Sequence, residues 1–259
     1  MVEKIGEGTY GQVYKGVNRG TGEVVAMKKM RVHTDKEGGL HITAIREIKI
    51  LKRLQHDYMV RLHEVVTSKG SWHNFDPDDP DEDDENEQGD LFLVLEYVDH
   101  DLAGLIDERY EFTPTEIKHI MKQLFEVLKY IHGENFIHRD LKCSNLLLSH
   151  DMKLKLADFG LARCIEAPYT TNQAKELDKL TNTVITLWYR PPELLLGQKK
   201  YGRAVDIWSA GCILAELIIR HPLFQGKTEV RRFNRIKTNS AITFKAISTT
   251  HESPHPPAS

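Results

Sequence analysis

The chain has 259 residues, of which 40% are hydrophobic, and this length can bury the core of one large domain or two modest ones. Its formal net charge of -3 is unevenly spread: residues 72–90 hold ten acidic side chains and no Lys or Arg, so the remainder carries +7. The three cysteines form no C-x-x-C pair and no apolar stretch is long enough to span a bilayer, which argues against a disulfide framework, a structural zinc site and a membrane protein.

The first 54 residues predict a small β-sheet followed by a helix. Three short strands, at 2–6, 12–18 and 23–29, are separated by turn residues and form a β-meander. Residues 41–54 have helical spacing, and Glu47 shares a face with the apolar residues Ala44 and Leu51. A carboxylate on that face points inward.

A glycine-rich motif, Gly6-Glu7-Gly8-Thr9-Tyr10-Gly11-Gln12-Val13, lies between the first two strands. Glycines let a backbone approach phosphates closely, and the position between two strands argues against a dinucleotide fold, although an ordinary hairpin with glycine turns is the alternative. On the third strand Ala26 and Lys28 share a face, where Ala26 leaves room for a base and Lys28 can reach its phosphates. A strand lysine is usually a solvated charge, but Glu47 offers this one a buried partner.

The middle of the chain predicts an inserted loop, a strand and a long helix. Residues 72–90 cannot bury apolar surface, so we expect a solvated loop between two strands, with a site for a basic partner as the alternative. Residues 91–97 resume as a buried strand. Thr113-Pro114-Thr115-Glu116 supplies the N-cap and capping box of a helix that ends before Gly133.

The later elements are short, apart from one central helix. Residues 145–148 and 153–156 suit brief strands, and residues 206–219 are apolar almost all round, which predicts a helix buried in the second domain. From Lys237 onward the periodicity disappears, so we expect residues 237–259 to form a disordered or non-native tail.

The segment His138-Arg139-Asp140-Leu141-Lys142-Cys143-Ser144-Asn145 follows the catalytic-loop pattern H-R-D-L-x-x-x-N, and Asp158-Phe159-Gly160 follows thirteen residues later. Phosphoryl transfer needs charge neutralisation and an oriented hydroxyl more than covalent help. Asp158 and Asn145 would hold Mg²⁺, Lys142 would contact the transferring phosphoryl group, and Asp140 would orient the attacking hydroxyl and accept its proton. The alternative is an accidental order of charged loop residues.

These motifs together resemble those of eukaryotic protein kinases, from about residue 2 to about residue 236. His41-Ile42-Thr43-Ala44-Ile45-Arg46-Glu47 resembles the P-x-T-A-I-R-E helix by which cyclin-dependent kinases bind a cyclin, with His41 in the place of proline. Three further segments resemble the transcriptional branch of that family: 99–102, 142–145 and 184–193. That branch pairs with cyclins of the K and T type and phosphorylates the heptad-repeat tail of RNA polymerase II.

The resemblance implies an α+β, two-lobed protein kinase fold, with a small antiparallel sheet lobe carrying one main helix and a larger, mostly helical lobe. It implies an N-terminal lobe at 1–97, including the insertion at 72–90, and a C-terminal lobe at 98–236. ATP and Mg²⁺ are the implied cofactors and the nucleus the implied location, without a membrane or direct nucleic-acid role. A cyclin would bind the Ile42–Glu47 helix.

The resemblance also implies a set of site residues. Lys28, Glu47, Asp140 and Lys142 are catalytic, and Asn145 and Asp158 hold the metal. Glu96 and Val98 bind adenine through their backbone, and Leu95 takes the gatekeeper position. The full nucleotide site comprises Ile5, Gly6, Gly8, Gly11, Val13, Ala26, Lys28, Leu95, Glu96, Val98, Asp101 and Leu148.

Activation and substrate choice are implied in the same way. Thr181 aligns with the activating phosphothreonine, and Arg46, Arg139 and Arg163 align with the arginines that grip it; a phosphate with roughly -1.5 to -2 charges needs such a cluster. Ile185 aligns with a residue whose twisted backbone favours proline after the phosphoacceptor, because proline has no N–H to satisfy. We therefore expect Ile185 at positive φ.

The resemblance stops before the last helices of the larger lobe, so we expect that lobe to be truncated, Glu193 to lack its arginine partner, and the helix at 206–219 to be partly uncovered. Two functions follow as hypotheses. One is a cyclin-dependent kinase acting on Ser/Thr-Pro sites. The other is a kinase-like chain that binds cyclin or nucleotide without turnover.

Overall fold

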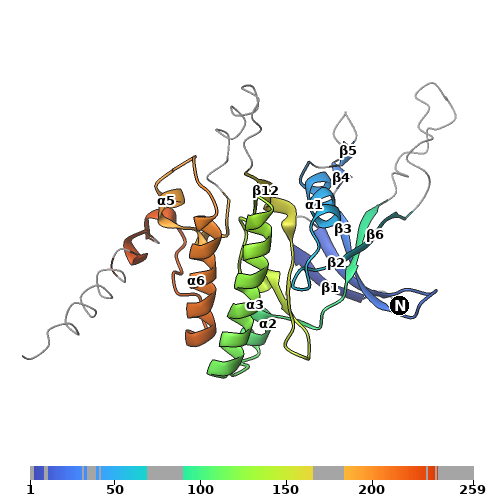
Figure 1. Ribbon diagram of the computed structural model, residues 1–259, viewed down its shortest axis with the longest axis horizontal. Helices are drawn as coiled ribbons and strands as arrows, with labels where there is room; N and C mark the ends of the chain where they lie inside the picture. The colour runs from blue at the N-terminus through green and yellow to red at the C-terminus, as the bar shows by residue number, and fades with distance from the viewer. Residues whose placement is uncertain are drawn as a thin grey trace, which may run out of the picture.

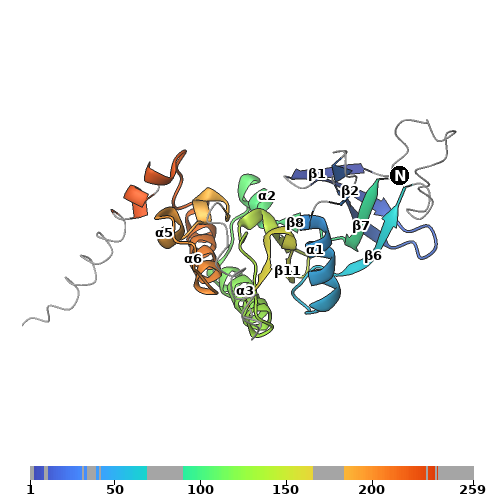
Figure 2. The ribbon, with the colours of Figure 1, turned by 90° about the horizontal axis from the view of Figure 1, so that it is seen from above.

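The computed structural model describes residues 3–8, 11–30, 32–33, 39–40, 42–68, 90–165, 184–231, 233–236 and 238. The chain forms two lobes joined near residue 97: a small lobe built on a sheet with one helix beside it, and a larger lobe dominated by helices (Figures 1 and 2). The acidic residues 72–89, Thr181 and the tail from residue 239 lie outside the described residues.

The small lobe is a five-stranded sheet in the order β1-β2-β3-β7-β6, with every neighbouring pair antiparallel. Its strands are β1 (Glu3–Gly8), β2 (Gly11–Val17), β3 (Val24–Met30), β6 (Leu62–Thr67) and β7 (Leu91–Glu96). Two short strands, β4 (Val32–His33) and β5 (Gly39–Leu40), pair with each other. The predicted meander and the strand before residue 97 are therefore confirmed.

The β6–β7 hairpin is closed by hydrogen bonds between Ser68, which precedes the acidic segment, and Asp90, which is its last residue. Ser68 N donates to Asp90 O at 2.9 Å, and Asp90 N donates to Ser68 Oγ at 2.8 Å. The two strands that flank the predicted insertion are therefore held together at a defined pair of residues, and Thr67 and Leu91 pair in register.

Helix α1 (Ile42–Arg53) packs between the sheet and the large lobe. Its buried face comprises Ala44, Glu47, Ile50 and Leu51, and the following Leu54 is also buried. Glu47 is only 1% exposed, as its helical spacing predicted. The helix contacts the 3₁₀ turn η2 (Phe159–Leu161) of the large lobe, so its position is tied to the segment that contains Asp158.

Two helices form the centre of the large lobe. Helix α3 (Pro114–Gly133) buries Ile120, Leu124, Leu128 and Ile131 at 1% exposure or less, and packs against α6 (Ala204–Ile219). Two shorter helices of this lobe are α2 (Leu102–Asp107) and α5 (Pro192–Leu195). The long helix was predicted to end before Gly133 but includes it, with Glu134 as the C-cap.

Short strands and 3₁₀ turns arrange the segments that face the small lobe. Strands β8 (His100–Asp101), β10 (Leu146–Leu148) and β11 (Leu154–Leu156) form a three-stranded sheet in the order β11-β10-β8. Strands β9 (Phe136–Ile137) and β12 (Arg163–Cys164) pair separately, and the remaining turns are η1 (Cys143–Asn145) and η3 (Leu187–Tyr189). These elements were too short for sequence periodicity to define fully.

One side of α6 is uncovered in the described structure. Ile207, Leu214, Ile218 and Ile219 are between 37% and 61% exposed, in agreement with the expected partial exposure of this helix. Glu193 is only partly buried, so an unpaired carboxylate at this position would cost less than the about 3 to 5 kcal/mol of a fully buried one. None of the described helices combines the length and hydropathy needed to cross a membrane.

The capping box of α3 gives a first testable prediction. Thr113 N donates to Glu116 Oε2 at 2.7 Å and Glu116 N donates to Thr113 Oγ1 at 3.2 Å. Thr113→Ala removes an acceptor for an otherwise unpaired helix N–H and should lower the free energy of unfolding by about 1 kcal/mol. Thermal or denaturant unfolding measures the loss. Thr115→Ala, two residues further on in the first turn and without a capping bond, should change stability by less than half as much. Equal losses would contradict the prediction.

Candidate active site

A cleft of about 810 Å³ lies between the two lobes and gathers most of the predicted site residues. Its walls come from β1, β2, β3 and α1 of the small lobe, from residues 95–101 at the junction, and from η1 and Asp158 of the large lobe. The predicted residues that line it are Ile5, Gly6, Gly11, Val13, Ala26, Lys28, Glu47, Leu95, Glu96, Val98, Asp101, Asp140, Lys142, Asn145 and Asp158.

At Gly11 of the glycine-rich motif, the structure has room only for a glycine. A Cβ built at this position would lie 1.9 Å from the carbonyl oxygen of Lys29 on the neighbouring strand. Any side chain would therefore force β2 and β3 apart where they pair. The glycine permits the close backbone packing that places this hairpin over the cleft.

Lys28 is the central cation of the cleft. Its Nζ lies 2.8 Å and 2.9 Å from the two carboxylate oxygens of Glu47 and 3.0 Å from Asp158 Oδ1. Burial alone would lower the pKa of Lys28, but the two carboxylates outweigh it and raise the pKa above its ordinary value. Lys28 therefore stays charged, and it joins α1 to the large lobe.

Asp158 occupies an unusual backbone conformation at the end of the strand that carries it into the cleft. Its φ of 60° and ψ of 75° lie in the left-handed region, which is uncommon for a residue with a side chain. Burial acts to raise the pKa of Asp158, but the Lys28 ammonium opposes this effect and lowers the pKa. The carboxylate is thus kept ionised and directed at the cleft. The left-handed backbone of Asp158 is strained, and backbone strain of this kind recurs at functional sites.

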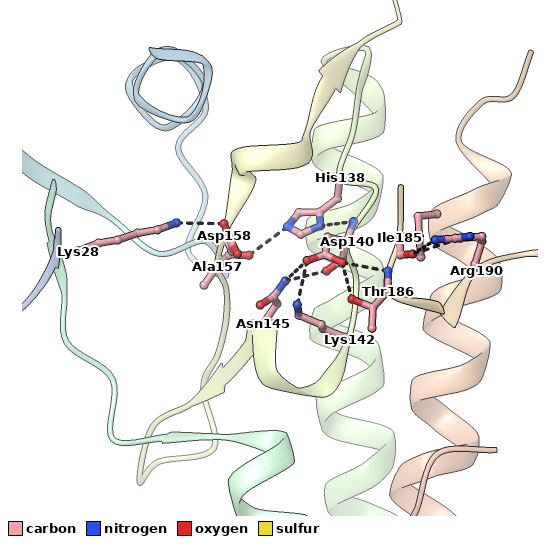
Figure 3. A network of polar contacts seen from close by, with 10 residues as sticks. All are labelled: Lys28, His138, Asp140, Lys142, Asn145, Ala157, Asp158, Ile185, Thr186 and Arg190. Atoms are coloured by element: carbon pink, nitrogen blue, oxygen red, sulfur yellow. Dashed lines mark hydrogen bonds and ion pairs between the residues drawn. The ribbon is translucent and has the colours of Figure 1, made fainter. Parts of the chain in front are cut away.

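Asp140 is held by three neighbours in a network drawn in Figure 3. Lys142 Nζ lies 3.0 Å from Asp140 Oδ2, and Asn145 Nδ2 donates to the same oxygen at 3.1 Å. Thr186 Oγ1 donates to Asp140 Oδ1 at 2.9 Å. The side chain is 5% exposed, so a carboxylate with fixed orientation faces the cleft beside a cation.

Asp206 on α6 binds the backbone of the catalytic loop on the side away from the cleft. The carboxylate is fully buried and accepts hydrogen bonds from His138 N and Arg139 N, each at 2.9 Å. His138 also supports the loop, because its ring nitrogens contact Ala157 O at 3.0 Å and Asp140 N at 3.2 Å (Figure 3). Neither residue was assigned a role from the sequence. The sequence did contain a sign that Asp206 is important. It is an acid in an otherwise apolar helix, and a buried carboxylate needs hydrogen-bond donors.

The donors in the cleft suit Mg²⁺ bound together with a phosphate chain. Asn145 turns its amide nitrogen to Asp140 O at 2.8 Å, which leaves the amide oxygen as a ligand, and Asp158 supplies carboxylate oxygens. Within the described part of the chain, no cluster of three or more His, Cys, Asp or Glu side chains could hold a metal unaided. Mg²⁺ in such sites takes one or two protein oxygens and completes its shell with phosphates and water.

The structure corrects one predicted site residue. Leu148 is 2% exposed and does not line the cleft, whereas Leu147 does. Successive residues of β10 point to opposite faces, and Leu146 and Leu148 share the core face. A count of strand alternation would have identified Leu147.

Thr186, which donates a hydrogen bond to Asp140, was also missed, because no spacing rule connects residues 46 positions apart.

The three arginines predicted to receive a phosphate are each described, although Thr181 is not. Nη1 of Arg46 is buried and meets no hydrogen-bond acceptor in the described part of the chain. Burial, reinforced by the nearby Arg139, lowers the pKa of Arg46. Arg139 donates to Leu161 O and Tyr201 Oη, and Arg163 donates to Ala162 O. An anion bound at Arg46 and Arg139 would therefore reduce the repulsion between the two guanidinium groups and accept a hydrogen bond from Arg46 Nη1.

Ile185 has φ of 67°, the positive value expected for it. Its carbonyl oxygen accepts hydrogen bonds from Arg190 Nη2 at 3.1 Å and Nε at 3.3 Å (Figure 3). A β-branched residue in this region is strained, and the bonds from Arg190 offset that cost. The carbonyl is consequently turned into the protein and is engaged there.

Comparison with known proteins agrees with this geometry. The family model described as "Protein kinase domain" matches residues 1–259. Among curated relatives, the chain is 48% identical over 242 residues to cyclin-dependent kinase 12 of Drosophila melanogaster and 52% identical over 237 residues to cyclin-dependent kinase C-2 of Arabidopsis thaliana. It is 46% identical over 236 residues to the CTD kinase subunit alpha of Schizosaccharomyces pombe.

Each of these alignments covers 91% of this chain, but only 19%, 44% and 35% of the respective relatives, so the chain spans less than half of their length. The two-lobed fold, the glycine-rich strand pair over the cleft and the family match support one assignment. The chain belongs to the protein kinase domain family.

Proposed function

We propose that the chain is an ATP-dependent serine/threonine protein kinase of the cyclin-dependent type. The observation that carries this proposal is the convergence of Lys28, Asp140, Asn145 and Asp158 on one cleft, although they lie far apart in the sequence. Relatives named cyclin-dependent kinases and a CTD kinase subunit support the same class. Capture of a cyclin or a nucleotide without turnover remains the competing function.

Each polar group has a role that follows from its position. Lys28, kept charged by its two carboxylates, would bind the phosphate chain, and Asn145 and Asp158 would hold Mg²⁺. When bound, Mg²⁺ neutralises phosphate charge. Asp140 would orient the substrate hydroxyl and accept its proton, with Thr186 and Asn145 fixing the carboxylate. Lys142, which forms an ion pair with Asp140, would stabilise negative charge on the transferring phosphoryl group.

A cyclin is the proposed partner of α1. Glu47 on this helix holds Lys28, so a protein that fixes the helix also fixes the cation of the cleft. Cyclins of the K and T type are proposed from the resemblance of the chain to the transcriptional branch, and a nuclear location follows from the same reasoning. Each is tested by capture of the partner from a defined mixture and by imaging of the tagged protein.

Serine or threonine followed by proline is the proposed substrate, in the heptad repeats of the RNA polymerase II tail. The carbonyl of Ile185 is engaged by Arg190 and is therefore withheld from a substrate amide. An amide N–H after the phosphoacceptor would lose its acceptor, whereas proline has no N–H to satisfy. The printed name "CTD kinase subunit alpha" of one relative is consistent with this substrate.

Asp140→Asn provides the first test of turnover. The substitution keeps the size of the side chain but removes the proton acceptor, so phosphate transfer should fall roughly a hundredfold to ten thousandfold. The assay is transfer of labelled phosphate to a Ser-Pro repeat peptide with a K-type cyclin present. Asp151→Asn, on an exposed turn, is the matched control and should retain the parental rate. Cyclin capture without transfer by the parent would instead favour the competing function.

Activation is tested at Thr181. Phosphorylation there should raise the transfer rate about tenfold or more, because a phosphate can form one to three charge-assisted hydrogen bonds with the arginines. Thr181→Ala should abolish the increase after treatment with a CDK-activating kinase. Thr183→Ala, two residues away, should retain it. An activation that survives in Thr181→Ala would place the phosphorylation site elsewhere.

The preference for proline is tested with three peptides that differ only after the serine. Ser-Pro should be phosphorylated with kcat/KM at least about tenfold above Ser-Ala, since an unsatisfied buried N–H costs roughly 1 to 3 kcal/mol. Ser followed by N-methylalanine lacks the N–H without having the proline ring, and should recover much of the rate. Equal rates for Ser-Pro and Ser-Ala would refute the role given to Ile185.

A further inference from the structure

Lys155 reaches from the large lobe to the end of the cleft opposite the phosphate-binding residues. It lies on β11 between Leu154 and Leu156, both fully buried, and strand alternation turns its side chain to the other face. Its Nζ lies 2.7 Å from Glu96 Oε1 and 2.8 Å from Glu96 Oε2. The Lys155 side chain is only 11% exposed, so it is not an ordinary solvated lysine.

Glu96 is fixed through both its backbone and its side chain. Its N–H donates to Arg61 O at 2.9 Å, and its Oε2 accepts from Arg61 N at 3.2 Å. Both contacts with Arg61 come from within the small lobe. The ion pair with Lys155 comes from the large lobe, so the carboxylate connects the two lobes at the point where the chain passes between them.

This connection lies at one end of the cleft, and its lysine is three residues before Asp158 at the other end. Residues 95–98 line one end, and β11 leads within two residues to Asp158, which pairs with Lys28 at the other end. A shift of Glu96 would therefore move the backbone at 96–98 relative to Asp158. A bound nucleotide spans both ends and depends on their separation.

We propose that Lys155 is a positioning residue for nucleotide recognition. Its ion pair with Glu96 holds the backbone at 96–98 at a fixed distance from the Lys28–Asp158 end, so that an adenine base and its phosphates are recognised together. Lys155 itself acts through Glu96 and does not contact the nucleotide. The proposal assumes the nucleotide binding proposed above and adds a residue that determines how the base is selected.

The test compares two nucleotides that share phosphates but differ in the edge of the base. Lys155→Met should weaken binding of Mg-ATP about fivefold to tenfold, as expected for the loss of a partly buried, charge-assisted pair, while Mg-GTP binding should change less than twofold. The ratio of the two Kd values, from titration calorimetry, is the readout, because general destabilisation would weaken both. Lys155→Arg keeps the cation and should restore most of the preference for ATP.

Lys29→Met is the matched control. Lys29 pairs with Asp90 at 2.5 Å, on the five-stranded sheet that carries Glu96 but outside the cleft, and its loss should leave the Kd ratio unchanged. Glu96→Gln removes the other half of the proposed pair and should reproduce the Lys155→Met effect, which keeps the test valid if one variant folds poorly. A folded Lys155→Met chain with the parental Kd ratio would overturn the proposal.

A measurement without ligand separates this proposal from the proposed kinase function. Hydrogen exchange of the Tyr97 and Val98 amides should be faster in Lys155→Met than in the parent or in Lys29→Met. Unchanged exchange would overturn the positioning role. A parent chain that binds neither nucleotide would refute the kinase function, and the exchange rates would still decide whether Lys155 holds this segment.

Discussion

The Lys28 ammonium, held between carboxylates from two different parts of the fold, is the contact on which the cleft depends. Glu47 reaches it from α1 and Asp158 reaches it from the large lobe, and all three side chains are largely withdrawn from water. Losing one partner of such a buried set leaves an uncompensated charge, at a cost of about 3 to 5 kcal/mol. The orientation of α1, the relation between the lobes and the charge in the cleft are consequently determined by the same three groups.

A second buried charge, Asp206, performs the corresponding task behind the cleft. The carboxylate binds two successive backbone N–H groups of the catalytic loop and also contacts His132 Nε2 at 2.8 Å. The loop has little regular structure of its own, so its shape is determined by this helix rather than by local preferences. Asp140 therefore faces the cleft as a result of contacts on both sides: Asp206 beneath the backbone, and Thr186 and Asn145 around the carboxylate.

The parts of this arrangement that follow a local pattern could be predicted from the sequence. The capping box before α3, the inward Glu47 and the shared face of Ala26 and Lys28 each depend on spacing within a single element, and the structure has all three. Contacts between distant segments could not be predicted in this way. The pairing of Thr186 with Asp140 and of Lys155 with Glu96 depends on how separate elements pack. The error at Leu148 is different, because alternation along β10 contained the information needed to choose Leu147.

The hydrogen bonds between Ser68 and Asp90 have a thermodynamic consequence for the β6–β7 connection. They hold the ends of the hairpin together independently of the number of residues that join them. Closing a longer connection costs only about 0.6 kcal/mol for each doubling of its length, so 21 residues in place of a tight turn cost about 1 to 2 kcal/mol. The sheet can therefore carry a long, strongly charged insertion at this corner, and the composition of that insertion is free to vary without altering the register of the strands beside the cleft.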